Sequence, residues 1–383
     1  MALHFDEAEY ENRKKRLLDA MAAEKLGAML LFAQESMYWL TGYDTFGFCF
    51  FQCLVVRADG EMRLMTRSAD LRQARQTSTI KDIVIWIDRE GANPARELKD
   101  MLDDMDLLGA RIGVEYQTHG LTAANGRRID EQLSSFGDLI DASGLVAGLR
   151  AVKSEAEIAC ARRAGELADL ALDAALPLIG PDADEGAILA AMQGAIFEAG
   201  GDYPGDEFII GSRRDALLCR YKSGRRRLSA NDQLTLEWAG AWRHYHAAMM
   251  RTVIVGAPGE RHLQLHAAAR EALEAVEAAM RPGKTFGDVY DAHARVLDAA
   301  ELTRHRLNAC GYSLGARFTP SWMDTPMFFA QNSQPVVPGM ILFAHMIIMD
   351  SETETAMTLG RTYLTTEGDP QPLSRHGLEL IVL

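Results

Sequence analysis

The sequence predicts an α+β protein of two domains, with a boundary near residue 150. Three observations lead to this prediction. In the first part of the chain, short apolar segments alternate with amphipathic ones, which is typical of a sheet covered by helices. In the second part, two pairs of long helix-forming segments lie among strands. A length of 383 residues is also sufficient for two separate hydrophobic cores.

The first domain, residues 1–150, is expected to begin with an amphipathic helix at 5–25, whose apolar residues fall on one face. An apolar strand at 28–32 and a turn at 41–44 follow. The aromatic and aliphatic run at 46–56 predicts a buried strand. Further strands and helices are expected to alternate over 62–66, 69–77, 82–87, 94–105, 111–114 and 123–134.

The second domain, residues 151–383, is expected to begin with a helix that Ser154 caps, with Glu155 and Glu157 in its first turn. Helices are predicted over 155–178, 183–199, 260–280 and 285–299. Strands are predicted over 206–211, 232–239, 243–255, 339–349 and 361–366. The two strands at 232–239 and 243–255 are expected to be joined by a turn at Gly240 and Ala241.

The composition excludes some classes of partner. A net charge of -14 argues against nucleic acid or an anionic membrane, since both attract basic surfaces. No apolar run reaches the roughly 18 residues that a membrane span needs. The charged N-terminal segment contains no apolar signal segment, so we expect a cytoplasmic protein.

Several motifs, in this order, resemble the creatinase/prolidase superfamily. They are Met37-Tyr38-Trp39-Leu40-Thr41-Gly42-Tyr43, Arg150-x-x-Lys153-Ser154, Arg251-Thr252, Gly311-Tyr312-Ser313-Leu314-Gly315, Pro338-Gly339-Met340 and Tyr363-Leu364-Thr365-Thr366. The resemblance spans nearly the whole chain. It implies a creatinase-type N-terminal α/β domain, followed by a catalytic domain with the pita-bread fold.

The peptidases of this superfamily hold two metal ions with two Asp, one His and two Glu. The resemblance places these five ligands at Glu237 or Trp238, Ala248, Tyr312, His345 and Gly360. Hard divalent ions need several oxygen ligands of negative charge. Since one carboxylate remains at most, we expect no metal and no other cofactor.

The superfamily also includes metal-free enzymes that hydrolyse small C–N compounds, creatinase and ectoine hydrolase among them. The segments Glu237-Trp238-Ala239-Gly240 and His244-Tyr245-His246-Ala247 resemble that branch. Creatinase has an acid-base histidine before this hairpin, whereas Arg220 stands at the matching place here. The resemblance is therefore closer to ectoine hydrolase.

Three residues are predicted to be catalytic. Glu237 lies between apolar residues of a strand, and burial would raise its pKa and suit it to act as base or nucleophile. His244 and His246 alternate on a predicted strand and would share one face; His246 is the expected acid-base group and His244 a substrate contact. His345 occupies a former ligand position in an apolar strand. A structural role, as a salt-bridged carboxylate or hydrogen-bonded core histidine, is the alternative for each.

Further residues are expected to contact the substrate. Arg220 can bind a substrate carboxylate with its planar guanidinium, and Tyr312 can donate a hydrogen bond to a developing oxyanion. Trp238 is expected to line the pocket. The resemblance implies a homodimer in which Phe46 covers the partner's pocket and contacts a cationic group through its ring.

Together these features predict a metal-independent hydrolase of a C–N bond in a small zwitterionic, amino-acid-like or cyclic amidine compound. Two alternatives stay open at this point. One is a Xaa-Pro peptidase-like metallohydrolase or metal-dependent lyase with altered ligands. The other is a non-catalytic homologue that binds a small molecule.

Overall fold

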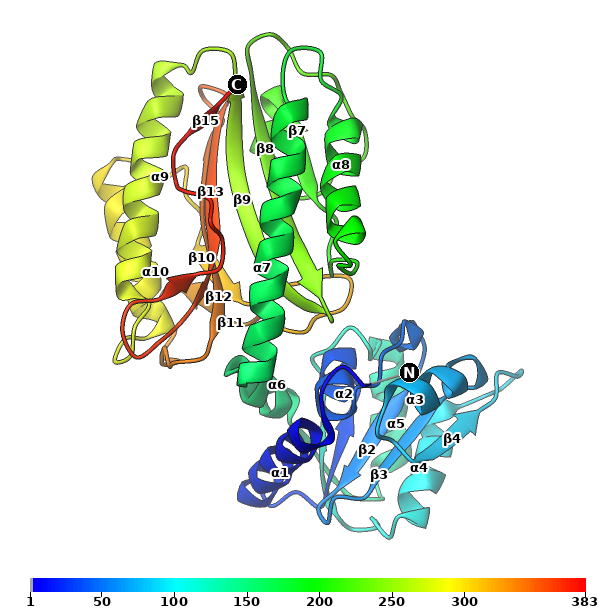
Figure 1. Cartoon of the computed structure of the whole chain (residues 1–383). Helices are drawn as coiled ribbons and strands as arrows, with labels where there is room; N and C mark the ends of the chain where they lie inside the picture. Colours follow the sequence, from blue (N-terminus) through cyan, green and yellow to red (C-terminus); the bar gives the residue numbers. More distant parts are fainter. Residues whose placement is uncertain (1–2) are drawn as a thin grey trace. The chain divides into compact units, whose positions relative to one another are not determined.

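The structure is a computed structural model that describes residues 3–383. The chain forms two compact units, Met1–Arg150 and Ala151–Leu383 (Figure 1). Within the described residues, no helix combines the length and the apolar character needed to cross a membrane.

The first unit is an α/β domain with one six-stranded sheet in the order β4-β3-β2-β1-β5-β6. Its strands are β1 (Ala28–Leu31), β2 (Cys53–Arg57), β3 (Met62–Arg67), β4 (Asp82–Trp86), β5 (Arg111–Val114) and β6 (Asp138–Asp141). Its helices are α1 (Glu7–Ala23), α2 (Gln34–Thr41), α3 (Leu71–Thr77), α4 (Pro94–Asp104), α5 (Ala123–Leu133) and α6 (Ser143–Ala151). The sheet is covered on both faces: α4 and α5 contribute to one hydrophobic cluster, and α1 and α2 contribute to the other.

Two segments of this unit differ from the sequence prediction. The long strand expected at 46–56 is a short 3-10 turn, Gly47–Cys49, and a strand that begins only at Cys53. The unpredicted helix α2 ends at Gly42, whose φ of 83° is available to glycine at little cost.

The second unit has a nine-stranded sheet, in which seven strands follow the order β11-β10-β12-β13-β9-β8-β7. These strands are β7 (Ile209–Ser212), β8 (Asp232–Trp242), β9 (Tyr245–Val255), β10 (Ala309–Ser313), β11 (Asp324–Phe329), β12 (Ile341–Asp350) and β13 (Thr355–Leu364). Two short strands, β14 (Gln371–Pro372) and β15 (Ile381–Val382), pair with β13 and β9.

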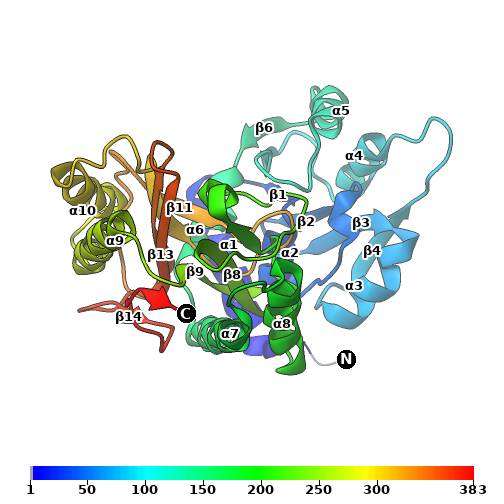
Figure 2. The same ribbon diagram turned by 90° about the horizontal axis from the view of Figure 1, so that it is seen from above.

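Two pairs of helices pack on this sheet. The first pair is α7 (Glu155–Ala175) and α8 (Glu185–Glu198), and the second is α9 (Glu260–Ala279) and α10 (Phe286–Ala299). Figure 2 shows α7 beside α8, and α10 beside α9. A capping box formed by Ser154 and Glu157 begins α7, as the sequence indicates. Together with the first unit, this architecture confirms the predicted α+β class.

The central hairpin, formed by β8 and β9, differs from the sequence prediction. β8 continues through Gly240 to Trp242, and the turn consists of Arg243 and His244, which have φ of 51° and 64°. Gly240 serves helix packing instead, because a Cβ there would overlap the carbonyl oxygen of Ala164 in α7. The predicted turn was therefore too early in the chain, and His244 is not on a strand.

Candidate functional site

The two neighbours Glu237 and Trp238 face opposite sides of the sheet, as successive strand residues must. The buried Trp238 indole donates a hydrogen bond of 2.9 Å to the carbonyl oxygen of Ala168 in α7. Trp238 thus packs against the helices, and Glu237 points to the opposite face. The sequence left two alternatives, Glu237 and Trp238, for the first ligand position. Only Glu237 lies on the face of the sheet that is turned away from α7.

One row of paired residues crosses the middle of the sheet on the face of Glu237. Glu237 lies opposite Met250 of β9, Met250 opposite Gly360 of β13, and Gly360 opposite His345 of β12. Directly paired residues of neighbouring strands share a face. The carboxylate and the imidazole therefore belong to one surface of the sheet, three strand pairings apart.

A second row of paired residues crosses the same strands two residues further along each strand. Since residues two apart on a strand share a face, this row is also on the Glu237 face. Ala248 is two residues from Met250 on β9, and Phe343 is two residues from His345 on β12. Tyr312 of β10 is paired with Phe343. All five positions that correspond to metal ligands in the resemblance, with Glu237 as the first, thus lie on one face.

The space near Gly360 is filled by apolar groups. A Cβ at Gly360 would lie 2.7 Å from Cζ of Phe343 and 2.9 Å from Cβ of Met250. The Tyr312, Phe343 and His345 rings contact one another, with centroids 5.4 to 5.6 Å apart. The face that carries Glu237 is therefore largely aromatic and apolar.

This environment changes the acidity of Glu237. Burial is the main cause and raises its pKa to about 7, while the charge of Arg220 and the hydroxyl group of Tyr312 lower it. Asp206 acts in the same direction as burial. A carboxyl group that titrates near neutral pH can both take up and release a proton under physiological conditions.

Tyr312 is fixed by a residue that the sequence analysis does not single out. The Nε1 atom of Trp322, in the connection between β10 and β11, donates a hydrogen bond of 2.9 Å to the Tyr312 hydroxyl oxygen. Burial also raises the pKa of Tyr312 well above its usual value, so the hydroxyl keeps its proton. No motif in the sequence connects these two residues.

His345 is held in its neutral form. Burial lowers its pKa to about 3, and the positive charges of its surroundings act in the same direction. Its Nδ1 atom is buried without a hydrogen-bond partner. Such atoms are uncommon in folded proteins and call for a specific explanation. A bound molecule that supplies the missing hydrogen bond is one such explanation.

Charged groups lie at the rim of the Glu237 face. Arg220 is exposed and donates a hydrogen bond of 2.8 Å to the carbonyl oxygen of Cys219. Its charge lowers the pKa of Glu237, of Asp206 and of Cys219. Burial and the adjacent Glu207 raise the pKa of Asp206 to about 6. The rim therefore offers one guanidinium group and two carboxyl groups.

Both ring nitrogens of His246 are engaged. Nε2 accepts a hydrogen bond of 2.9 Å from the backbone N–H of Gly205, and Nδ1 lies 3.3 Å from the carbonyl oxygen of Gly315. The side chain is fully buried, which lowers its pKa to about 3. With this geometry His246 connects two loops and has no free nitrogen for a leaving group.

Two other predicted site residues do not belong to the Glu237 face of the sheet. His244 is in the β8–β9 turn, where its ring stacks on Phe318 with centroids 4.1 Å apart. Phe46 belongs to the first unit, where it is 70% exposed and contacts Phe48 edge to face. Its contact with a partner's substrate stays a prediction.

The donors on the Glu237 face do not fit a dinuclear metal centre. Ala248 and Gly360 supply no ligand atom, and only one carboxylate remains among the five positions. Throughout residues 3–383, no group of three or more His, Cys, Asp and Glu side chains is arranged to hold a metal ion. Oxygen-rich cages need more carboxylates than this.

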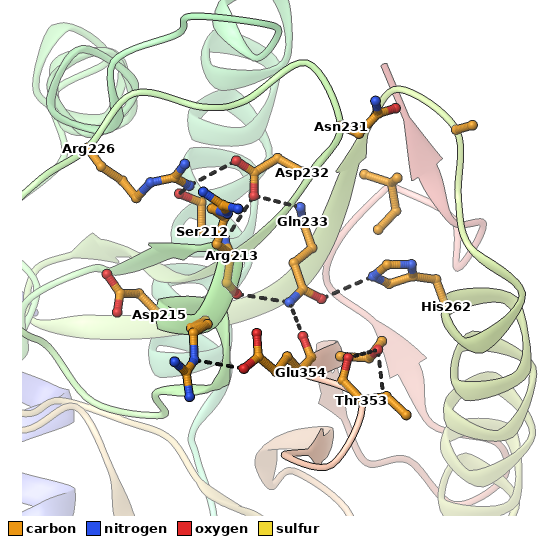
Figure 3. Close-up of a pocket in the computed structure, with 14 residues that line it drawn as sticks. Ser212, Arg213, Asp215, Arg226, Asn231, Asp232, Gln233, His262, Thr353 and Glu354 are labelled. Carbon is orange, nitrogen blue, oxygen red and sulfur yellow. Dashed lines mark hydrogen bonds and ion pairs between the residues drawn. The ribbon is translucent and has the colours of Figure 1, made fainter.

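A separate pocket of about 570 Å³ lies at the start of β8 (Figure 3). Its polar groups bind one another. The amide of Gln233 donates to the carbonyl oxygens of Arg213 and Glu354 and accepts from His262, while Asp232 pairs with Arg226 at 2.8 Å. None of the buried side-chain atoms that lack a partner in residues 3–383 lines it. We therefore place the candidate site around Glu237.

Comparisons with known proteins match both units. Residues 13–152 match the creatinase/prolidase N-terminal domain, and residues 159–367 match metallopeptidase family M24. An uncharacterised hydrolase/peptidase of Sinorhizobium fredii is 27% identical over 393 aligned positions, covering 99% of both chains. Ectoine hydrolase of Halomonas elongata is 25% identical over 359 positions, covering 89% of each.

Solved structures show the same fold. Dipeptidase PepE from Mycobacterium ulcerans superposes with a TM-score of 0.84 at 22% identity, covering 99% of both chains. The prolidase from Thermococcus sibiricus superposes with a TM-score of 0.88 at 16% identity, covering 98% of this chain and 99% of its own. At these identities the likeness is one of architecture.

Proposed function

We propose a function from the premise that this chain belongs to metallopeptidase family M24 and is a hydrolase of that family. The proposed reaction is metal-independent hydrolysis of a C–N bond in a small zwitterionic compound, such as a cyclic amidine. The similarity to ectoine hydrolase over 89% of both chains supports this substrate class.

One observation carries the proposal. The five positions expected to hold metal ions share one face of the sheet, yet two of them are Ala248 and Gly360. The other three retain titratable groups, Glu237, Tyr312 and His345. The face has kept groups for proton transfer and hydrogen bonding, while its capacity to bind metal is reduced.

In the proposed reaction Glu237 acts as general base and then as general acid. Its carboxylate takes a proton from water while the water oxygen bonds to the amidine carbon. The C–N bond then breaks, and the protonated carboxyl returns that proton to the leaving nitrogen. A pKa of about 7 suits both steps near neutral pH. This assignment replaces the one in which His246 was the acid-base partner.

The neighbouring groups would bind and orient the substrate. Arg220 would bind its carboxylate from the rim, and Asp206 a positively charged nitrogen. The neutral His345 would exchange a hydrogen bond with the reacting group through its unpartnered nitrogen. Tyr312, which stays protonated, would donate a hydrogen bond. A homodimer with Phe46 over the partner's pocket remains part of the proposal.

Turnover by matched variants tests this proposal. We expect the purified protein to open ectoine or a related cyclic amidine, as followed by NMR of the substrate. Glu237→Gln should lose about 10³-fold or more in kcat, because the base is removed without a change of shape. Glu166→Gln is the control, since Glu166 is 63% exposed on α7, and it should retain full activity. No turnover of any amidine, or a fully active Glu237→Gln, would contradict the proposal.

A further inference from the structure

The pocket of about 570 Å³ at the start of β8 is large enough for a small organic molecule (Figure 3). The 3-10 turn Arg213–Leu217 forms part of its wall and lies between the pocket and Glu237. The carbonyl oxygen of Ala216 in this turn accepts a hydrogen bond of 2.9 Å from the hydroxyl of Thr235, two residues before Glu237 on β8. The pocket is therefore a second place in the domain, distinct from the Glu237 face.

The charges that line the pocket do not balance locally. Three arginines and three carboxylates line it. Each carboxylate has a cation of its own, in the pairs Asp232–Arg226, Glu354–Arg214 and Asp215–Lys222, with N···O distances of 2.8, 3.0 and 2.6 Å. Burial lowers the pKa of His262, so this ring adds no positive charge at neutral pH. Among the described lining residues, the charge of Arg213 is left without a counterion.

Asp232 cannot take that role, although it is adjacent. Its carboxylate oxygens accept four hydrogen bonds of 2.8 to 3.0 Å, from the Arg226 guanidinium and from the backbone N–H groups of Arg213, Ser229 and Gln233. An ionised carboxylate offers about four lone-pair positions, so all are used. The exposed guanidinium of Arg213 forms no hydrogen bond or ion pair anywhere in residues 3–383.

The backbone of Arg213 is fixed in a conformation that is uncommon for a residue with a side chain. Its φ is 52°, in the left-handed region that glycine adopts at no steric cost. Its N–H donates to Asp232 and its carbonyl oxygen accepts from the Gln233 amide, each at 2.9 Å. Both partners are buried, with exposures of 8% and 6%. An arginine at a position that suits glycine indicates that its side chain is needed there.

We propose that this pocket binds the phosphate group of a small organic molecule, with Arg213 as the principal contact. A guanidinium group matches the oxygens of a phosphate with two parallel N–H donors. This site goes beyond the proposed function and does not depend on it.

The neighbouring Arg214 favours a phosphate over a carboxylate. A phosphate monoester carries nearly two negative charges at neutral pH, whereas a carboxylate carries one. Arg214 can supply the second positive charge, because its ion pair with Glu354 joins side chains that are 80% and 51% exposed. Exposed pairs of this kind contribute little and exchange partners readily. The exposed amide of Asn231 also lines the pocket and can bind the organic part of the ligand.

The experiment is a calorimetric titration of the full-length protein with inorganic phosphate, at an ionic strength held constant with sodium chloride. We expect saturable binding. Arg213→Gly should weaken it about tenfold or more, because the charged donor is lost while glycine suits the backbone. Arg243→Gly is the matched control, since Arg243 has a φ of 51° in the β8–β9 turn. It should bind phosphate as the wild type does.

Two further titrations test the assigned charges. Glu354→Gln should bind phosphate about two- to fivefold more tightly, because it frees Arg214 from its partner. Acetate should bind the wild type at least about tenfold more weakly than phosphate does. The inference is overturned if the wild type shows no saturable binding, if Arg213→Gly binds as the wild type does, if Arg243→Gly loses as much affinity, if Glu354→Gln binds no more tightly, or if acetate binds as tightly as phosphate.

The same variant separates this site from the proposed reaction. Arg213 has no part in the Glu237 face, so Arg213→Gly should retain amidine turnover while it loses phosphate binding. Phosphate binding without any amidine turnover would support the pocket and contradict the reaction. Loss of both in Arg213→Gly would contradict a separate phosphate site.

Discussion

Glu237 is buried among apolar groups, yet it must ionise to act as the proposed base. Met250 and the aromatic rings of Phe343 and Tyr312 surround its face of the sheet, and burial is the largest influence on its pKa. Desolvation penalises the ionised form. The same residue that suits proton transfer therefore weakens the fold when it ionises.

The sign of this effect makes a prediction about stability. The folded pKa of about 7 lies above the ordinary value of 4.5, so the folded protein binds this proton more tightly than the unfolded chain. Its contribution to stability is complete below pH 4.5 and is lost as the pH rises through about 7. Glu237→Gln cannot ionise and should escape this loss.

We expect Glu237→Gln to be more stable than the wild type at high pH, by up to about 3 kcal/mol. The advantage should shrink towards low pH, where the wild-type carboxyl is protonated in both states. Urea unfolding at about pH 8.5 and about pH 5 measures both values. An equal difference in free energy of unfolding at the two pH values would contradict the assigned pKa.

At the scale of single residues, the sequence predicts the titratable side chains of the site better than it predicts their hydrogen-bond partners. Glu237, Tyr312, His345 and Arg220 are identified from motifs, and the structure brings the first three to one face. Trp322 is not predicted, because its bond to Tyr312 depends on how the loop between β10 and β11 folds. Only tertiary structure specifies that contact.

At the scale of elements, the position of one turn decides which side chains share a face. Placing the turn at Gly240 and Ala241 makes His244 a strand residue beside His246. The observed turn at Arg243 and His244 removes His244 from the strand. Arginine and histidine are not favoured in tight turns, whereas glycine is. The sequence therefore points to Gly240 rather than to Arg243 and His244.

The reason for Gly240 can be tested directly. Gly240→Ala should destabilise the protein by about 3 kcal/mol or more, since its methyl group would overlap the backbone of α7. Gly194→Ala is the control, because Gly194 lies within α8 with no atom within 4 Å of the added carbon. It should stabilise by about 0.5–1 kcal/mol. Equal unfolding free energies for both variants would show that Gly240 serves no packing role.

At the scale of the whole molecule, fold and chemistry are determined by different parts of the sequence. The strands, the helix pairs and the α+β class follow from apolar periodicity over hundreds of residues, and most were predictable. The proposed chemistry depends on five positions distributed over β8, β9, β10, β12 and β13. The same architecture recurs in a dipeptidase and a prolidase that are only 22% and 16% identical to this chain, so the fold alone does not determine the chemistry.

The central claim is that this scaffold hydrolyses a C–N bond without a metal ion. The most direct measurement is elemental mass spectrometry of protein purified without chelator, on a preparation whose amidine turnover is known. We predict metal far below one equivalent per chain together with full turnover. About one or two equivalents of Mn, Fe, Co or Zn per chain, with turnover lost when they are removed, would contradict it and favour a metallohydrolase with altered ligands.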